Sequence, residues 1–157
     1  MYSNSISGLQ RPKITYLLKA GRRTRLAEPG LAPTEFFYGY QQLLAQGCDT
    51  SIVEDSDVGM AHPLPLVARI ANKFSRLLGG LPVGMALSLL MTRGYQQLNN
   101  DDCIVATTNG MGMALATAKA LGKVKAPVLL LAMGLLPIKP SRWQIRLFGA
   151  LTRHIHL

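Results

Sequence analysis

Residues 102–116 read DCIVATTNGMGMALA, and this stretch decides the fold. Its first six residues are rich in apolar and β-branched side chains, which favour a strand. The glycine-containing segment Asn109-Gly110-Met111-Gly112 follows as a turn, and residues 113–121 favour a helix. A strand, a turn and a helix in this order form the repeating unit of α/β proteins.

Three other segments share this strand chemistry: residues 13–18, 48–54 and 126–133. The last is almost entirely apolar, as expected of a central parallel strand that is buried on both faces. Residues 21–33 contain so much Gly, Pro and charge that we predict a long loop there.

Helical periodicity fills the remaining segments. We predict a helix from Pro33 or Thr34 to a stop at Gly47, and two helices within residues 64–98 with a break near residues 79–82. A final amphipathic helix covers residues 141–157, with no strand after it. Its apolar stripe consists of Trp143, Leu147, Leu151 and Ile155.

Strands that alternate with helices predict a Rossmann-like α/β fold, an open and mostly parallel sheet with helices on both faces. Such sheets bind ligands at the carboxyl ends of their strands. We therefore expect one shared edge for the loops that begin at Gly21, Glu54, Thr108 and Met133.

The composition fits one domain: 157 residues, of which 48% are hydrophobic and 16% charged. We assign residues 1–11 to a flexible N-terminal segment and residues 12–157 to the Rossmann-like domain. Seventeen basic residues against eight acidic ones predict an anionic partner. No nucleic-acid-binding motif is recognisable, so we do not expect nucleic acid to be that partner.

Cofactor and targeting signals are few. The polar N-terminus predicts a cytoplasmic protein, and the uncharged stretch between Arg76 and Arg93 is shorter than the ~20 residues of a membrane span. Cys48 and Cys103 lack paired spacing and are expected to be buried thiols. The three histidines, His62, His154 and His156, lack metal-ligand spacing, so we expect no metal site.

Four segments, in their order and spacing, resemble the N-terminal domain of GT-B glycosyltransferases, especially family 4. They are residues 13–30, 33–37, 102–116 and 126–135. The resemblance implies that this domain binds a sugar or lipid-linked acceptor and no cofactor of its own. It also implies a C-terminal GT-B domain, not contained in this sequence, that binds the nucleotide-sugar donor and without which the chain is inactive.

The resemblance also concerns individual positions. Met133 and Gly134, which we count among the candidates for binding an acceptor or a phosphate, correspond to the turn after the fourth strand, where many relatives have His before Gly. Methionine neither donates nor accepts a proton, so we expect no histidine-assisted role at this position.

Several segments are candidates for binding an acceptor or a phosphate. The loop Gly21-Arg22-Arg23-Thr24 offers guanidinium groups to an anion, with a solvated basic loop as the alternative. Asn109, Gly110 and Gly112 offer backbone N–H groups at a helix start, with a tight structural turn as the alternative. The glycine pattern is only part of a dinucleotide fingerprint, which disfavours an NAD(P)-dependent oxidoreductase domain.

Acidic residues provide further candidates, although the sequence assigns no catalytic residue. Glu35 contacts an acceptor hydroxyl or only stabilises the start of its helix. Glu54, Asp55 and Asp57 bind a ribose or another hydroxyl, or are simply solvated.

The helix expected from Leu64 has two adjacent stripes, one apolar and one basic. Arg69, Lys73 and Arg76 form the basic stripe, and Leu66, Ile70, Phe74 and Leu77 form the apolar one. This pattern fits contact with an anionic membrane surface, or a helix packed on the sheet with solvated charges. It gives a second hypothesis, a non-catalytic membrane-surface or partner-binding module, and it predicts a peripheral location at the inner membrane face.

Overall fold

The computed structural model describes residues 11–28, 37–61, 70, 71, 73, 75, 81–131 and 140–156. Within them the strands are β1 (Lys13–Leu18), β2 (Asp49–Glu54), β3 (Cys103–Ala106) and β4 (Val128–Leu130). The helices are α1 (Arg22–Ala27), α2 (Tyr40–Ala45), α4 (Val83–Met91), α5 (Tyr95–Leu98), α6 (Asn109–Ala120) and α7 (Arg142–Thr152).

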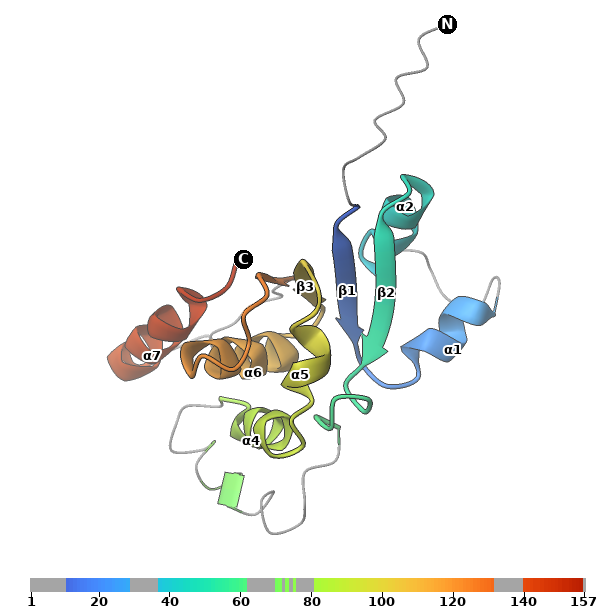
Figure 1. Ribbon diagram of the computed structural model, residues 1–157. Coiled ribbons are helices and arrows are strands. Elements are labelled where there is room, and N and C mark those ends of the chain that lie inside the picture. The colour runs from blue at the N-terminus through green and yellow to red at the C-terminus, as the bar shows by residue number, and fades with distance from the viewer. Residues whose placement is uncertain are drawn as a thin grey trace, which may run out of the picture.

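The four strands form one sheet in the order β2-β1-β3-β4, and every neighbouring pair is parallel. Helices lie on both sides of it, with α1 and α2 on one side and α4, α6 and α7 on the other (Figure 1). The predicted Rossmann-like α/β fold is confirmed. All four predicted strands are found, although β4 is shorter than expected.

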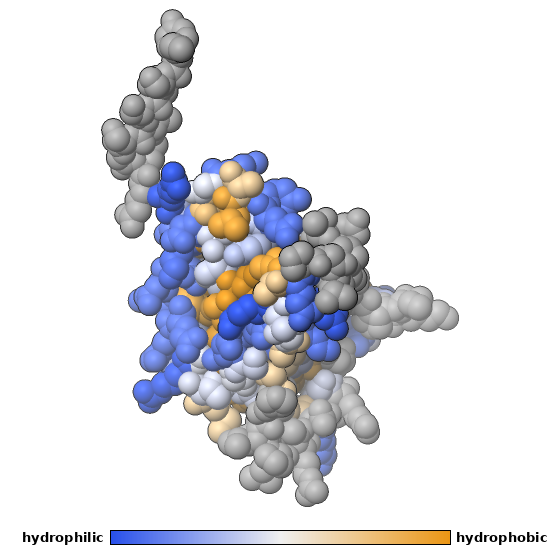
Figure 2. Space-filling view, turned by 90° about the vertical axis from the view of Figure 1, so that its right-hand side faces the viewer, coloured by the Kyte–Doolittle hydropathy of each residue, from blue (hydrophilic) through white to orange (hydrophobic). Residues whose placement is uncertain are grey.

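Side chains alternate between the two faces of the sheet, as the pleat requires. Leu17, Ile104 and Leu130 belong to the larger core, which α4 and α6 cover. Tyr16 and Val105 face the opposite way, into a smaller core closed by Phe37. The edge strand β2 is only partly buried, and Figure 2 shows a band of hydrophobic residues across this side of the molecule.

The loop predicted for residues 21–33 is wrong in its first part, because Arg22–Ala27 forms α1. Gly21 has φ 84°, which turns the chain sharply from β1 into the helix. Glu54 Oε1 then accepts a hydrogen bond of 2.7 Å from the backbone N–H of Arg23. This carboxylate satisfies one of the free N–H groups at the start of α1, and local sequence patterns do not reveal such a distant cap.

The helix predicted from residue 33 or 34 is also corrected. Residues 33–36 lie outside the described part, and α2 begins only at Tyr40. Tyr38 and Gly39 have φ 49° and 84°, and this turn places Phe37 in the smaller core. The predicted stop is confirmed, since α2 ends at Ala45 just before Gly47, whose φ is 80°.

A second break divides the helix predicted to run to residue 98. Thr92 Oγ1 donates to the carbonyl of Val58, and Arg93 has φ 55°, so α4 and α5 are separate helices. Of the expected break near residues 79–82, only Leu81 and Pro82 are described, and α4 begins directly after them.

The last helix also differs from its prediction. α7 ends at Thr152, and His156 pairs with Leu129 in a parallel bridge beside β4. The backbone N–H of Leu130 donates to His156 O, and that of His156 donates to Val128 O, each at 2.7 Å. The predicted apolar stripe is wrong at Trp143, which is 47% exposed, whereas Phe148 is buried.

Gly94 gives a test of the packing between the α4–α5 turn and the loop after β2. A Cβ atom at this position would collide with the backbone carbonyl of Val58, which cannot move without disturbing the core. We expect Gly94→Ala to lower the free energy of unfolding by about 1–3 kcal/mol, measured by urea denaturation. The matched control is Gly149→Ala in α7, where nothing lies within 4 Å of the new atom. We expect it to stabilise the protein by about 0.5–1 kcal/mol; equal effects of the two changes would contradict this account.

Candidate functional site

The strand order creates a defined place for a ligand. The chain passes from β1 to β2 on one side and then crosses to β3 on the other side of β1. Connections therefore diverge between the carboxyl ends of β1 and β3, where open α/β sheets usually bind their ligands. The segments after β1, β2 and β3 share this edge, as expected, whereas Met133 lies outside the described residues.

A cavity of about 510 Å³ opens at this edge. Its polar lining comes from Lys19 after β1, Asp55 after β2, Thr108 after β3, and Ser75. The other described lining residues are apolar or glycine: Met60, Ala61, Pro82, Val83, Gly84, Met85 and Met111. The cavity thus combines a few polar groups with an apolar wall, the usual composition of a small-molecule site.

Asp55 is the acidic group among the described lining residues of the cavity and is 6% exposed. Its Oδ1 accepts a hydrogen bond of 2.8 Å from the backbone N–H of Ala20. Its own N–H donates to Leu18 O, and its carbonyl accepts from the N–H of Met60. A carboxylate has about four acceptor positions, so one hydrogen bond leaves capacity for a ligand. The alternative of a solvated carboxylate is wrong for Asp55.

The other polar groups of the cavity differ in how far the protein already uses them. Ser75 Oγ donates to Leu81 O at 2.7 Å, and Thr108 Oγ1 accepts from the N–H of Met111 at 3.3 Å. Lys19 is exposed at the end of β1. Lys19 is therefore the cationic side chain that the described lining offers to an anionic group.

The glycine-containing segment 109–112 is not the turn that the sequence predicts, because α6 begins at Asn109 with Thr108 as its N-cap. A Cβ at Gly112 would collide with the side chain of Leu130, so this glycine permits close packing of α6 on β4. Asn109 and Gly110 line a second cavity, of about 400 Å³, with Tyr38, Thr107, Thr108 and Leu131. Two of the three predicted binding residues, Asn109 and Gly110, therefore line a cavity, whereas Gly112 packs against Leu130 of β4.

The predicted basic loop is used within the protein. Arg23 Nη2 donates to Asp57 Oδ2 at 2.5 Å and to Ile52 O at 3.1 Å. Gly21 serves the turn into α1, and Thr24 is exposed. None of the residues 21–24, which include Arg22, is among the described lining of the 510 Å³ cavity. Arg23 is paired with Asp57, and this segment is therefore used within the protein and is not part of the described cavity lining.

Two ionisable groups at opposite ends of the sheet have shifted pKa values, Asp57 after β2 and Cys103 at the start of β3. The backbone N–H of Glu54 and then the guanidinium of Arg23 lower the pKa of Asp57 below its ordinary value of 3.8. Partial burial raises the pKa of the Cys103 thiol, which keeps it protonated near neutral pH. Cys48 and Cys103 are free and partly buried, rather than fully buried as predicted.

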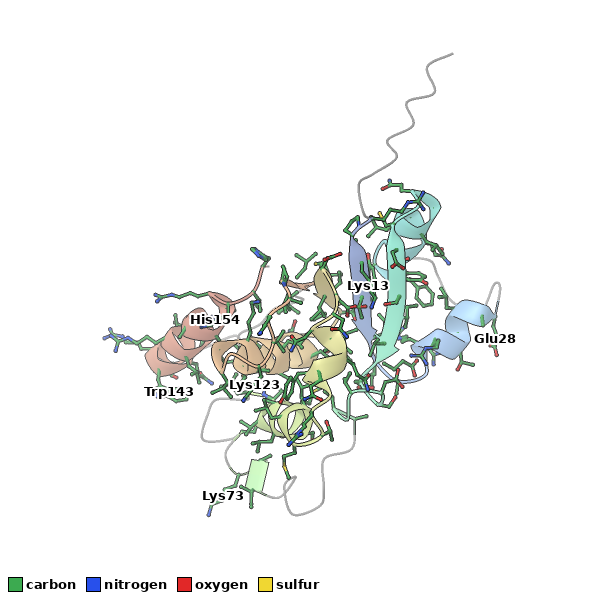
Figure 3. All side chains as sticks on the ribbon, viewed as in Figure 1. Lys13, Glu28, Lys73, Lys123, Trp143 and His154 are labelled. Carbon is green, nitrogen blue, oxygen red and sulfur yellow. The ribbon has the colours of Figure 1, made fainter. Side chains whose placement is uncertain are left out.

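Several predicted site residues lie outside the described part of the chain: Glu35, Arg69, Arg76, Met133 and Gly134. Lys73 is described and exposed, and its side chain points away from the rest of the molecule (Figure 3). Ile70 is 48% exposed, whereas Ala71 is buried. Ile70 and Lys73, one from each predicted stripe, are thus both accessible to solvent.

Sequence reasoning missed Lys19 and Ser75 as cavity residues. The signal for Lys19 was its position directly after a predicted strand, where the chain reaches the ligand-binding edge. Ser75 carried no comparable signal, because its position in the cavity depends on tertiary packing. Within the described ranges, no three His, Cys, Asp or Glu residues group as metal ligands.

Comparisons with protein-family models, with curated proteins and with solved structures find no match to this chain. In the part of the chain that the structure describes, no helix has both the length and the apolar composition needed to cross a membrane.

The lowered pKa of Asp57 predicts how stability depends on pH. A carboxyl group whose pKa is lower in the folded state than in the unfolded state stabilises the fold at pH values above its unfolded-state pKa. This contribution is lost as the pH falls through the folded-state pKa. We expect Asp57→Asn to be less stable than the wild type near neutral pH, with the difference shrinking at pH values below 3.8. Urea unfolding across this range measures it. The exposed Glu28 (Figure 3) provides the control, Glu28→Gln; a constant deficit of Asp57→Asn at every pH would contradict the assignment.

Proposed function

We propose that this domain binds the acceptor of a glycosyltransferase at the carboxyl edge of its sheet. The acceptor is a sugar or a lipid-linked sugar, and a further domain supplies the nucleotide-sugar donor. The observation that carries the proposal is the buried carboxylate of Asp55, which lines a cavity at the point where the chain connections diverge.

The cavity chemistry supports a hydroxylated ligand. A buried carboxylate with free acceptor capacity binds hydroxyl groups well, because the hydrogen bond to a charged acceptor is strong. Lys19 can neutralise a phosphate or another anionic group of the same ligand. The wall of Met60, Val83 and Met85 can contact the apolar face of a sugar ring.

The assignment to sugar transfer rests on the resemblance of four segments to the N-terminal domain of GT-B enzymes. Two of these segments, residues 13–30 and 102–116, supply Lys19 and Thr108 to the cavity. In this arrangement the domain orients the acceptor hydroxyl, and sugar transfer requires the donor-binding domain on the other side of the cleft. The less favoured alternative is an NAD(P)-dependent oxidoreductase domain.

Asp55→Asn tests the proposal with little risk to the fold, because the amide oxygen can still accept from the N–H of Ala20. We expect monosaccharides or their 1-phosphates to shift the backbone amide NMR signals of Ala20, Asp55 and Thr108 in the wild type. The variant should weaken this binding by about tenfold, since a hydrogen bond to a charged group contributes about 1.5–3 kcal/mol. Lys19→Met should weaken selectively the binding of the phosphorylated sugars.

Two matched controls lie away from the cavity. Asp102 Oδ2 also accepts a backbone N–H, that of Lys13, and Lys123 is exposed, so Asp102→Asn and Lys123→Met should leave binding unchanged. The proposal fails if no sugar in the panel shifts the cavity amides. Shifts caused by NAD⁺ alone would favour the oxidoreductase alternative instead.

A second candidate function, binding to an anionic membrane surface, is favoured by the charge distribution. Residues 58–157 contain eleven of the 17 basic residues and only two of the eight acidic ones, Asp101 and Asp102. Asp101 forms a 2.9 Å ion pair with Lys13 and is 8% exposed, so it offsets little of this surface charge. Ile70 and Lys73 provide an exposed apolar group and an exposed cation in the same segment.

Liposome flotation tests this second candidate. We expect the wild type to float with vesicles that contain phosphatidylglycerol but not with phosphatidylcholine vesicles. Changing Arg69, Lys73 and Arg76 to Glu should abolish flotation, because each basic residue contributes about 1 kcal/mol near an anionic surface. The control changes Lys123, Lys125 and Arg153 to Glu, which alters the net charge equally. Equal loss in both variants would show attraction by net charge alone and contradict a specific face.

A further inference from the structure

An apolar groove of about 270 Å³ lies between α4, α6 and α7. Leu87 and Leu90 line it from α4, Leu147 and Leu151 line it from α7, and Leu121 lies at its rim with 58% of its surface exposed. The groove therefore leaves hydrocarbon surface accessible on the layer of helices that covers the larger core.

The described residues of the groove offer almost nothing to a polar occupant. Among them, the one hydroxyl belongs to Thr117, whose Oγ1 donates to the carbonyl of Met113 at 2.8 Å. An occupant with hydrogen-bonding groups would lose its water without finding partners, which costs free energy. A hydrocarbon chain has no such groups and gains from leaving water.

The groove adjoins the polar cavity. Pro82 and Val83, at the start of α4, line both spaces. A ligand that crosses these two residues places one end beside Asp55 and the other end among the leucines. Only an amphiphile has the matching chemistry at both ends.

The surrounding charge favours an anionic amphiphile. None of the helices α4, α6 and α7 contains an acidic residue, whereas Lys119, Arg142 and Arg146 lie on α6 and α7. Such a layer attracts a phosphate-bearing lipid and does not repel it.

We infer that the groove binds the hydrocarbon chain of a lipid-linked acceptor whose hydroxylated head group lies in the Asp55 cavity. This inference rests on the proposed function and narrows it, because it selects the lipid-linked acceptor over the free sugar. The two sites then act as one, with the apolar chain adding affinity and fixing the direction in which the head enters.

A pair of glucosides separates the head from the chain. Octyl β-D-glucoside, used below its critical micelle concentration, and methyl β-D-glucoside share the head group. We expect the octyl compound to bind at least about tenfold more tightly, because each buried methylene group adds to the hydrophobic contribution. Calorimetric titration gives the affinities, and NMR titration locates the chain through the methyl signals of Leu87, Leu90 and Leu121.

Two exposed positions provide matched variants. Leu121 lines the groove and is 58% exposed, whereas Met91 is 57% exposed and is not among the groove residues. We expect Leu121→Gln to weaken the octyl glucoside by about fivefold and to leave the methyl glucoside unchanged. Met91→Gln should change neither affinity, and neither variant disturbs the buried core.

The outcomes distinguish the inference from the proposed function. If the two glucosides bind equally, or if the two variants behave alike, the groove does not hold the chain although the sugar site stands. Perturbation of Trp143 and Ile145 instead of the groove methyls would assign the chain to the outer surface of α7 and overturn the inference. If neither glucoside shifts the signals of Ala20 and Asp55, the proposed function fails as well.

Discussion

The hydrogen bonds of Asp55 join the ends of β1 and β2 at the carboxyl edge of the sheet, where the cavity lies. Its N–H continues the parallel pairing by donating to Leu18 O, and its carboxylate accepts from Ala20 N at the next turn. The loop that follows β2 then closes back on the same residue through Met60. A carboxyl group that is 6% exposed is costly to bury, and the hydrogen bond from the N–H of Ala20 offsets part of this cost. The residue that fixes the backbone at this edge is therefore also the one that gives the cavity its acidic wall.

The rest of the cavity follows from how closely the elements pack around this point. Gly112 lets α6 approach β4, and Gly94 lets the α4–α5 turn approach the carbonyl of Val58. These contacts place α6 against the sheet and the α4–α5 turn against the loop after β2, and Pro82 and Val83 at the start of α4 line the cavity. Packing that serves stability thus also determines how the polar cavity and the apolar groove adjoin, so in our proposal the core sets the length of a ligand that spans both.

Sequence patterns predicted the regular part of this arrangement. The four strands and their mostly parallel arrangement were predicted from apolar and β-branched runs that alternate with helical segments, because such runs leave a strong local signal. The order of the strands in the sheet was not predicted. The failures lie where tertiary contacts decide. α1 has a cap from Glu54, which is distant in the sequence, and α4 ends where Thr92 contacts the carbonyl of Val58 and Arg93 has a positive φ. The same limit applies to the site, because Asp55 and Lys19 are recognisable as strand-end residues, but their shared cavity with Ser75 exists only after the loops pack.

Charge separates the chain into two parts that meet at this cavity. The first 57 residues contain equal numbers of acidic and basic residues, so the excess of positive charge belongs entirely to residues 58–157. Lys19 and Asp55 come from the balanced part, whereas Thr108 and the α4 wall come from the basic part. In the proposed function, an anionic amphiphile would be attracted at long range by the basic part of the chain, which includes α4, α6 and α7, since long-range attraction depends on net charge. Its hydroxyl groups would then be bound at short range by the carboxylate of Asp55, because hydrogen bonds act only on contact. Attraction and recognition would thus be performed by different parts of the chain, which join at the start of α4.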